Sequence, residues 1–368
     1  MPNIVEGIKY SNLQNAIERL MENLVQLRDE GGNFLLKLGD GRTVDTKGWN
    51  GWDWTHGIGL YGMYRYHAMT GSQKALALVE DWFHSRFQEG TVPKNVNTTC
   101  ALLTLAYLYG ETKDAVYLPY LDRWLDWVYH DMPRTEEGGF QHITYDLENK
   151  QQLWDDTLMM TVLPLAKAGL LLGYPEYVAD AEKQFLLHAK YLADRKTGLW
   201  FHGWSFLGRH NFGNVLWGRG NCWVTVAIPE FLEMTDLRPG DPVREFLLDT
   251  LCCQVKTLAE LQDRSGLWHT VLNDPSSYLE ASATAGFAYG ILKAVRKRYI
   301  GAEYEKNGVC AVQGVLRNIA PDGTLQQVSF GTPVFQTAEE YKTVPLTPMP
   351  YGQAMAILCL TEFLYRYI

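Results

Sequence analysis

Positive charge is scarce in this chain. Its 368 residues include 33 Lys and Arg against 42 Asp and Glu, so its formal net charge is −9. Proteins that bind nucleic acid usually carry a basic patch that neutralises the phosphates. The acidic balance therefore predicts that nucleic acid is not a partner.

Long uninterrupted apolar runs are also missing. The longest apolar helix expected from the sequence, residues 158–172, contains Pro164 and Lys167. It is shorter than the roughly 20 apolar residues that cross a bilayer, and it has the character of a buried core helix. The first residues show no basic region followed by an apolar stretch, so no secretory signal is predicted. We therefore expect a cytoplasmic protein with no membrane partner.

Cysteines are few and follow no metal-binding or redox pattern. The chain has Cys100, Cys222, Cys252, Cys253, Cys310 and Cys359. None belongs to a CxxC pair or to a Cys/His cluster with ligand spacing, so we expect reduced thiols and no metal site. The chain also lacks the motifs GxxxxGK, GxGxxG, GxSxG and HExxH, which removes the usual support for nucleotide binding, serine hydrolysis and zinc proteolysis. No cofactor is predicted.

Aromatic residues, by contrast, are plentiful. They make up 13% of the chain and include 12 Trp and 21 Tyr. Their flat apolar faces suit sugar rings, whose C–H surfaces stack on them, although a core rich in tryptophan accounts for the composition equally well. The positions of these residues along the chain must decide between the two interpretations.

A short pattern of glycine, an aromatic residue and histidine recurs about every 60 residues. It occupies residues 138–142, 198–202 and 266–269, and a weaker relative lies at 322–325. Between the first two copies lie two helical patterns. Residues 158–172 are apolar nearly all round, whereas residues 177–192 are amphipathic, and Gly173 and Pro175 break the chain between them. Each unit is thus predicted to be a buried helix, an outer helix and a glycine-aromatic loop.

Six apolar runs of the buried type can be counted along the chain. They begin near His56, Asn97, Asp156, Arg219, Ser282 and Gly352. Six two-helix units predict an all-α fold, a closed (α/α)6 barrel forming one domain over residues 1–368, because the polar end caps of an open solenoid are not evident. In such a ring the inner helices all run in one direction. The loops at their N-termini are therefore expected to gather at one mouth of the central cavity.

The polar cluster with most information opens the most apolar helix. Asp155 and Asp156 follow Trp154 at this point. Helix capping explains one aspartate at a helix N-terminus. A second aspartate at the predicted cavity mouth favours a catalytic role for the pair. A carboxyl group beside Trp154 in a closed cavity loses solvation, which raises its pKa and lets it hold a proton to donate. We predict that Asp156 is the catalytic acid/base and that Asp155 supports it.

A second cluster, residues 217–223, opens the next inner helix. Arg219 lies there between two glycines and is flanked by tryptophans. A guanidinium group binds carboxylates through paired hydrogen bonds and stays charged, so Arg219 is a candidate carboxylate-binding residue, with a structural salt bridge as the alternative. His142 and His202 end two of the glycine-aromatic loops and are candidates on the same face. Asp53 and His56 are weaker candidates of the same kind.

Three segments together resemble a known family. Residues 134–142, 151–160 and 217–223 resemble the unsaturated rhamnogalacturonyl hydrolases, glycoside hydrolase family 105, and the likeness extends over roughly residues 50–360. The resemblance implies an (α/α)6 barrel whose partner is a small unsaturated oligosaccharide made by pectin lyases, such as unsaturated galacturonyl-rhamnose. It also implies a reaction that begins by hydrating the double bond, after which the glycosidic bond breaks.

The resemblance assigns roles to single residues. The catalytic aspartate falls on Asp156. The resemblance also places His142, His202, Arg219 and Trp223 at positions of family motifs, and we predict that they bind substrate. We add Asn97, Trp154 and Asp155 to the predicted substrate-binding residues because of their positions at the inner-helix starts. Many relatives carry an aspartate where this chain has Asn97, so the resemblance implies a subgroup with a different sugar preference. An asparagine can still hydrogen-bond sugar hydroxyls or water.

The residues themselves leave three alternatives open. A sugar epimerase on the same barrel would use facing histidines, which His142, His202 and His269 could supply. An ordinary glycosidase would need two facing carboxylates, and adjacent residues such as Asp155 and Asp156 point in different directions. Hydration of an enol ether needs only one proton donor that returns as a base. A non-catalytic helical-repeat module would instead show an exposed concave patch.

Overall fold

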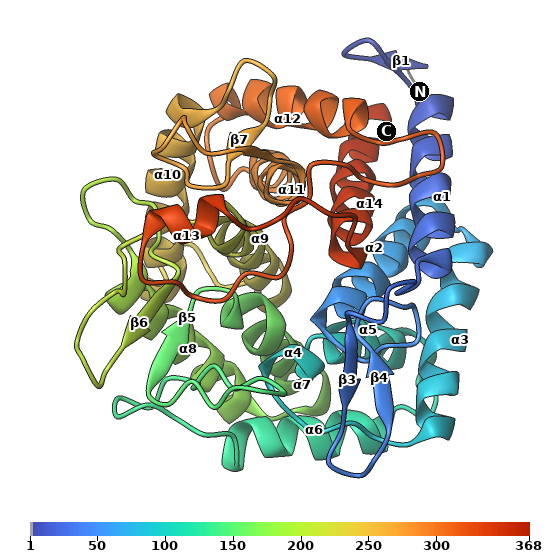
Figure 1. Cartoon of the computed structure of the whole chain (residues 1–368), viewed down its shortest axis with the longest axis vertical. Coiled ribbons are helices and arrows are strands. Elements are labelled where there is room, and N and C mark those ends of the chain that lie inside the picture. Colours follow the sequence, from blue (N-terminus) through green and yellow to red (C-terminus); the bar gives the residue numbers. More distant parts are fainter. Residues whose placement is uncertain (1–2) are drawn as a thin grey trace.

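Two concentric layers of helices surround a common axis in the computed structural model, which describes residues 3–368 (Figure 1). The inner helices are α2 (Trp54–Thr70), α5 (Ala101–Thr112), α7 (Leu163–Leu172), α9 (Gly218–Thr235), α11 (Ala281–Arg296) and α14 (Pro350–Leu364). Each packs against the next, and α14 packs against α2, so the ring closes. This arrangement confirms the predicted (α/α)6 barrel.

The outer helices cover the inner ring. They are α1 (Tyr10–Gln26), α3 (Gln73–Glu89), α6 (Leu118–His130), α8 (Pro175–Leu192), α10 (Pro242–Leu261) and α12 (Glu305–Arg317). Each buries one face, as Leu13, Ile17, Leu20 and Leu24 of α1 do, whereas every residue of α14 is buried. No helix within residues 3–368 has the length and apolar character needed to cross a bilayer.

Short strands and helices lie in the segments that connect the helices of the ring. Four antiparallel pairs of strands join β1 (Ile4–Val5) to β2 (Ile8–Lys9), β3 (Leu35–Lys37) to β4 (Thr43–Asp45), β5 (Gln152–Trp154) to β6 (Gly203–Ser205) and β7 (Trp268–His269) to β8 (Leu279–Glu280). Two short helices, α4 (Val96–Thr99) and α13 (Ala338–Lys342), complete the loops together with two single turns of 3₁₀ helix at Ala302–Tyr304 and Tyr365–Tyr367. These pieces lie at loops, where function usually resides.

The inner helix predicted over residues 158–172 has an irregular first turn. It begins as a π-helical turn, η1 (Leu158–Val162), and continues as α7. Pro164 follows directly and has no N–H to donate, so the regular α-helical bond cannot form there, and Leu163 N–H bonds to the carbonyl of Leu158. The sequence predicted the helix but not this wider turn, which begins two residues after Asp156.

The recurring glycines form the same turn in all four loops. Gly138, Gly198, Gly266 and Gly323 have φ angles of +83°, +75°, +84° and +86°, a region that side chains other than glycine's rarely adopt. In each turn the glycine N–H bonds back to a carbonyl three or four residues earlier. A β-carbon at Gly198 would lie 2.7 Å from the backbone of Cys253 on α10. Each loop thus packs closely against an outer helix, which explains the repeat.

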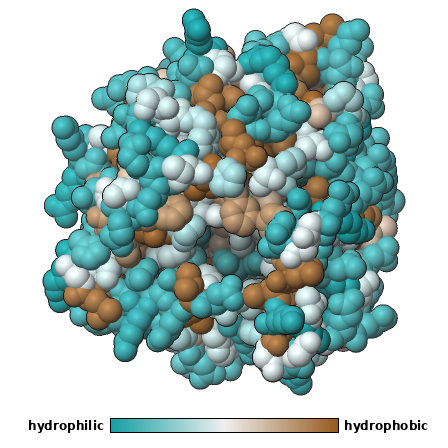
Figure 2. All heavy atoms as spheres, viewed as in Figure 1, coloured by the Kyte–Doolittle hydropathy of each residue, from teal (hydrophilic) through white to brown (hydrophobic). Residues whose placement is uncertain are grey.

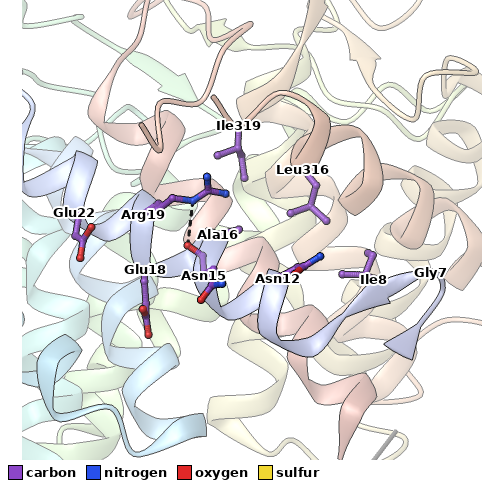
Figure 3. A pocket seen from close by; sticks show the side chains of 10 residues that line it. All are labelled: Gly7, Ile8, Asn12, Asn15, Ala16, Glu18, Arg19, Glu22, Leu316 and Ile319. Carbon is purple, nitrogen blue, oxygen red and sulfur yellow. Dashed lines mark hydrogen bonds between the residues drawn. The ribbon is translucent and has the colours of Figure 1, made fainter. Parts of the chain in front are cut away.

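The first outer helix packs against the last glycine loop. A hollow lies between α1 and the end of α12, and Figure 3 shows the Arg19 side chain of α1 extending toward Ile319. Arg19 donates a hydrogen bond to the backbone oxygen of Pro321 at 3.3 Å. Outer elements form the sides of this hollow, and none of the predicted site residues lines it.

We expect Gly198→Ala to destabilise the protein more than Gly173→Ala. Both glycines have positive φ, but a β-carbon at Gly173 meets nothing within 4 Å. Gly173→Ala should therefore lower the free energy of unfolding by about 1–2 kcal/mol, the cost of the backbone conformation. Gly198→Ala should lose about 1–3 kcal/mol more through crowding. Equal losses in denaturant titrations would contradict close packing at this turn.

Candidate active site

Paired strands bring the recurring glycine-aromatic loops together at the mouth of the barrel. Strand β5 pairs with β6, and the N–H of Asp155 donates to the carbonyl of His202 at 3.1 Å. On the other side of β5, the N–H of His142 donates to the carbonyl of Gln152 at 3.1 Å. Three stretches of chain distant in sequence thus lie side by side. Their side chains converge as the ring topology predicted.

A row of aromatic rings results from this pairing. The ring of His142 stacks on Trp154 with centroids 4.2 Å apart and planes 9° apart. Trp154 meets His202 edge-on at 5.4 Å, and His202 lies 4.1 Å from Trp217 at the start of α9. The row forms a continuous wall with flat apolar faces. Such a wall suits the C–H face of a sugar.

Asp156 lies at the end of this row. Its carboxyl oxygen Oδ1 is 3.2 Å from Nδ1 of His142, and its side chain is 17% exposed. Burial raises the pKa of Asp156 to about 7, against a smaller opposing effect of the positive charge of Arg219. Burial also lowers the pKa of His142 to about 3, so this ring is neutral; it hydrogen-bonds with the Thr157 hydroxyl at 2.9 Å. The carboxyl group can therefore hold a proton near neutral pH.

Asp155 has a different environment. It is fully buried, and neither carboxyl oxygen has a hydrogen-bond partner among residues 3–368. Burial, reinforced by the charge of Asp156, raises its pKa well above the ordinary value, so the group is neutral. A β-carbon at Gly220 would overlap this carboxyl group, which shows that Asp155 packs against the first turn of α9. Its position favours the predicted supporting role.

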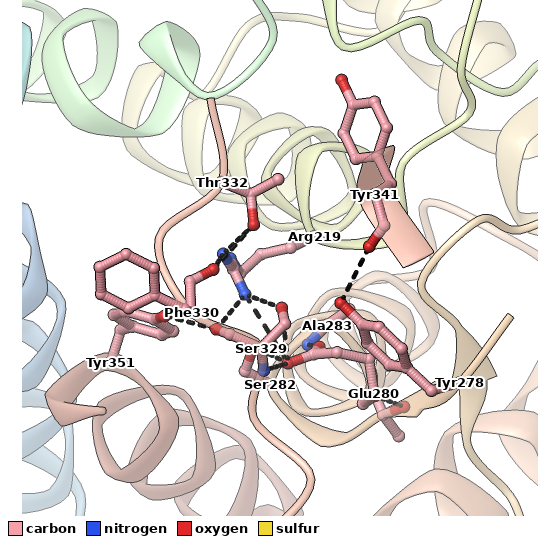
Figure 4. A network of polar contacts seen from close by, with 11 residues as sticks. Arg219, Tyr278, Glu280, Ser282, Ala283, Ser329, Phe330, Thr332, Tyr341 and Tyr351 are labelled. Atoms are coloured by element: carbon pink, nitrogen blue, oxygen red, sulfur yellow. Dashed lines mark hydrogen bonds and ion pairs between the residues drawn. The ribbon is translucent and has the colours of Figure 1, made fainter. Parts of the chain in front are cut away.

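Arg219 is the centre of a buried polar network (Figure 4). It is 1% exposed, and Nη1 donates to the backbone oxygen of Ser329 at 3.0 Å and to its hydroxyl at 2.6 Å. Nη2 donates to the backbone oxygen of Phe330 at 2.9 Å and to the Thr332 hydroxyl at 3.3 Å. Nη1 is also 3.7 Å from a carboxyl oxygen of Glu280. The guanidinium therefore ties α9 to the start of α11 and to residues 329–332.

The residues held by Arg219 belong to a long crossover segment, residues 326–349. It contains α13, passes across the mouth of the ring in Figure 1 and leads into α14. Its second attachment is Tyr341, a buried residue whose hydroxyl lies 2.7 Å from Nδ1 of His202. Figure 2 shows that this face of the molecule is hollowed near its centre. The crossover segment thus forms part of the rim of the mouth.

Two other predicted residues lie elsewhere at the same mouth. Trp223 is 2% exposed in the second turn of α9, and its ring meets that of Trp54 edge-on at 5.8 Å. Trp54 in turn stacks on Tyr351 at 4.7 Å. Asn97 is half-buried in α4 and lines a separate pocket together with Asp53. Of the predicted residues, His142, Trp154 and His202 thus form one wall with Asp156 at its end, and Asn97 lines a separate pocket. Asp155, Arg219 and Trp223 are buried behind these surfaces.

Sequence reasoning gave no role to Thr157, Glu280 or Tyr341. Glu280 directly precedes an inner helix, as Asp156 does, so the same positional argument would have found it. Tyr341 belongs to the crossover segment, which follows no repeat spacing and offers no such signal. The weaker candidate His56 is fully buried against Trp49.

Comparison with known proteins settles the family. The family model described as Glycosyl Hydrolase Family 88 matches residues 26–367. The chain belongs to glycosyl hydrolase family 88. An unsaturated rhamnogalacturonyl hydrolase of Bacillus subtilis strain 168, YesR, is 32% identical over 316 residues, which cover 85% of this chain and 90% of that protein.

Solved structures support the predicted resemblance. A crystal structure from Klebsiella pneumoniae, described as a possible member of the GH105 family, is 57% identical with a TM-score of 0.98, and covers 100% of this chain and 96% of that one. An unsaturated glucuronyl hydrolase from Bacillus sp. GL1, 17% identical with a TM-score of 0.70 and 95% coverage of both chains, shares the fold. The predicted resemblance is confirmed, and the family-88 protein is a glycoside hydrolase.

We expect Arg219→Met to destabilise the family-88 enzyme by about 3–5 kcal/mol, because it removes the positive charge 3.7 Å from the buried Glu280 carboxyl group and leaves the acceptors at Ser329 and Phe330 without their donor. Adding Glu280→Gln should recover part of this loss, since the amide carries no charge. The measurement is the free energy of unfolding of both single variants and the double variant. Strictly additive losses would contradict a direct coupling between the two residues.

Proposed function

We propose that this chain removes a 4,5-unsaturated uronic acid from lyase-generated oligosaccharides, with unsaturated galacturonyl-rhamnose as the first substrate to test. The observation that carries the proposal is the Asp156 carboxyl group, which is buried enough to hold a proton near pH 7 and lies beside a neutral His142. The names of relatives that act on unsaturated rhamnogalacturonyl and glucuronyl substrates support it.

In the proposed reaction Asp156 donates its proton to C4 of the unsaturated sugar. The double-bond electrons form the new C4–H bond, and water adds at C5 while the Asp156 carboxylate takes the water's proton. The resulting hemiketal opens to a ketone at C5, and the hemiacetal left at C1 then releases the second sugar as an alcohol. One residue thus acts first as acid and then as base.

The burial of Asp155 supports this one-carboxylate mechanism over a double displacement. A retaining or inverting glycosidase needs a second carboxylate that faces the sugar ring or its attacking water. The nearest neighbour in sequence, Asp155, is fully buried against Gly220. We propose that it keeps the first turn after β5 in position.

We propose that the wall of His142, Trp154 and His202 binds the uronate ring, and that the charge of Arg219 attracts its carboxylate. The influence of Arg219 on the pKa of Asp156 supports a position close to the reacting atoms. Trp223 and Asn97 complete the proposed substrate-binding residues.

Closure of the ring between α14 and α2 supports our proposal that residues 1–368 form one domain. We also propose a cytoplasmic location, on the composition of the chain.

Asp156→Asn should lower turnover at least ~100-fold, the usual lower range for losing a general acid/base. Asparagine keeps the shape but has no proton to transfer, so the melting temperature should change little. Asp155→Asn should keep a larger share of activity. The assay follows the loss of ultraviolet absorbance of the conjugated double bond in unsaturated galacturonyl-rhamnose, with the saturated disaccharide as a control. A folded, active Asp156→Asn variant would overturn the proposal.

The pH dependence of kcat/KM should reflect the loss of the proton from Asp156. Its pKa is raised from 3.8 to about 7, so the protonated form required for the first step persists to neutral pH and is lost above it. We expect kcat/KM to fall about tenfold for each pH unit above roughly pH 7. An ordinary aspartate would show the fall near pH 4. Rates that stay constant from pH 6 to pH 9 would exclude Asp156 as the titrating acid.

A further inference from the structure

A pocket of about 330 Å³ opens between the β3–β4 hairpin and the starts of α2 and α4. Its lining combines polar side chains with aromatic rings: Asn33, Phe34, Asp53, Asn97, Tyr145 and Phe330. We call it the Asp53 pocket. Its size lies at the lower end of the range found for small-molecule sites.

The Asp53 pocket adjoins the Asp156 site through one short stretch of chain. His142 contacts Asp156, and Thr144 and Tyr145, two and three residues later, line the pocket. The α-carbons of His142 and Thr144 are at most about 7 Å apart. The Asp53 pocket and the Asp156 site therefore border the same short stretch of chain.

Asp53 is an unusual group for a pocket wall. It is 7% exposed, and Oδ1 accepts the N–H of Trp54 at 2.7 Å. Capping aspartates usually bond to the second or third N–H of a helix, not the first. Its other oxygen, Oδ2, has no hydrogen-bond partner among residues 3–368. Burial raises the pKa of this carboxyl group to about 7, so it can either donate or accept a hydrogen bond near neutral pH.

The other walls supply what a sugar ring requires. The rings of Phe34 and Phe330 lie 5.4 Å apart, and each is half-buried. Apolar faces next to hydrogen-bonding groups match a pyranose, which has C–H faces and a rim of hydroxyls. The backbone of Phe330 is held by Arg219, and Tyr145 donates to the Trp52 carbonyl at 3.0 Å, so both walls are fixed before any ligand arrives.

The pocket also has an outlet. A groove of about 940 Å³ between the end of α1 and the crossover segment shares Asn33, Phe34 and Phe330 with it. The shared residues make the two hollows neighbours on either side of the phenylalanine pair. Further units of an oligosaccharide would have room on that side.

We propose that the Asp53 pocket is a subsite for the sugar on the leaving-group side of the cleaved bond, and that Asp53 hydrogen-bonds the hydroxyls of that sugar. This inference rests on the proposed function. Asp53 would then determine specificity without taking part in the transfer of the proton at C4.

Two substrates separate this role from catalysis. Unsaturated galacturonyl-rhamnose would fill both sites, whereas the methyl glycoside of the unsaturated galacturonate would fill only the Asp156 site. We expect Asp53→Asn to lower kcat/KM for the disaccharide about 10-fold or more, the range for a hydrogen bond with a charged or buried partner. The value for the methyl glycoside should change less than about twofold. Phe34→Leu, which leaves the helix start intact, should show the same selective loss.

Asp241→Asn is the matched control. Asp241 caps the outer helix α10 by accepting the N–H groups of Val243 and Arg244 at 2.9 and 3.2 Å, so it has the same helix-start position without a pocket. Its ratio of the two kcat/KM values should equal that of the unchanged protein. Equal losses on both substrates, or no loss on either, would overturn the Asp53 subsite while leaving the proposed function intact. Failure of the unchanged protein on both substrates would overturn the proposed function and, with it, this inference.

Discussion

Six inner helices that close on one another must all begin at the same end of the barrel, and the chemistry of this protein depends on that constraint. Helix starts separated by about sixty residues in sequence become neighbours around one mouth. The pairing of β5 with β6 then fixes the residues that precede two of these starts, so Trp154 lies between His142 and His202. The ring thus provides the mouth, and the strand pairing places these side chains side by side at it.

Burial at this mouth sets the protonation states. The same packing that buries most of Asp156 raises its pKa to about 7 and keeps His142 neutral. Arg219 opposes the shift at Asp156 and at the same time holds the crossover segment through Ser329 and Phe330. Arg219 therefore acts on two parts of the mouth: its charge lowers the pKa of Asp156, and its hydrogen bonds hold the crossover segment in place. Because Phe330 belongs to that segment, Arg219 also holds one wall of the neighbouring Asp53 pocket.

Much of this arrangement was predictable because it repeats. Apolar runs and recurring glycines gave the number of helices, the direction of the inner ring and the positions of Asp156, His142 and His202. The π-helical turn at residues 158–162 was missed because it depends on one missing N–H, at Pro164, inside an otherwise regular pattern. The contact between Tyr341 and His202 was missed because the crossover segment follows no period. The bonds of Arg219 to backbone carbonyls leave no mark in the sequence.

The most direct test of the account is the position and stereochemistry of proton transfer. The reaction on unsaturated galacturonyl-rhamnose should be run in D₂O and followed by NMR from its first minutes. A carboxyl group fixed beside the sugar should deliver one deuterium to a single face of C4, and this should accompany loss of the double bond before rhamnose is released. Early release of a uronic acid that still contains its double bond would contradict the account.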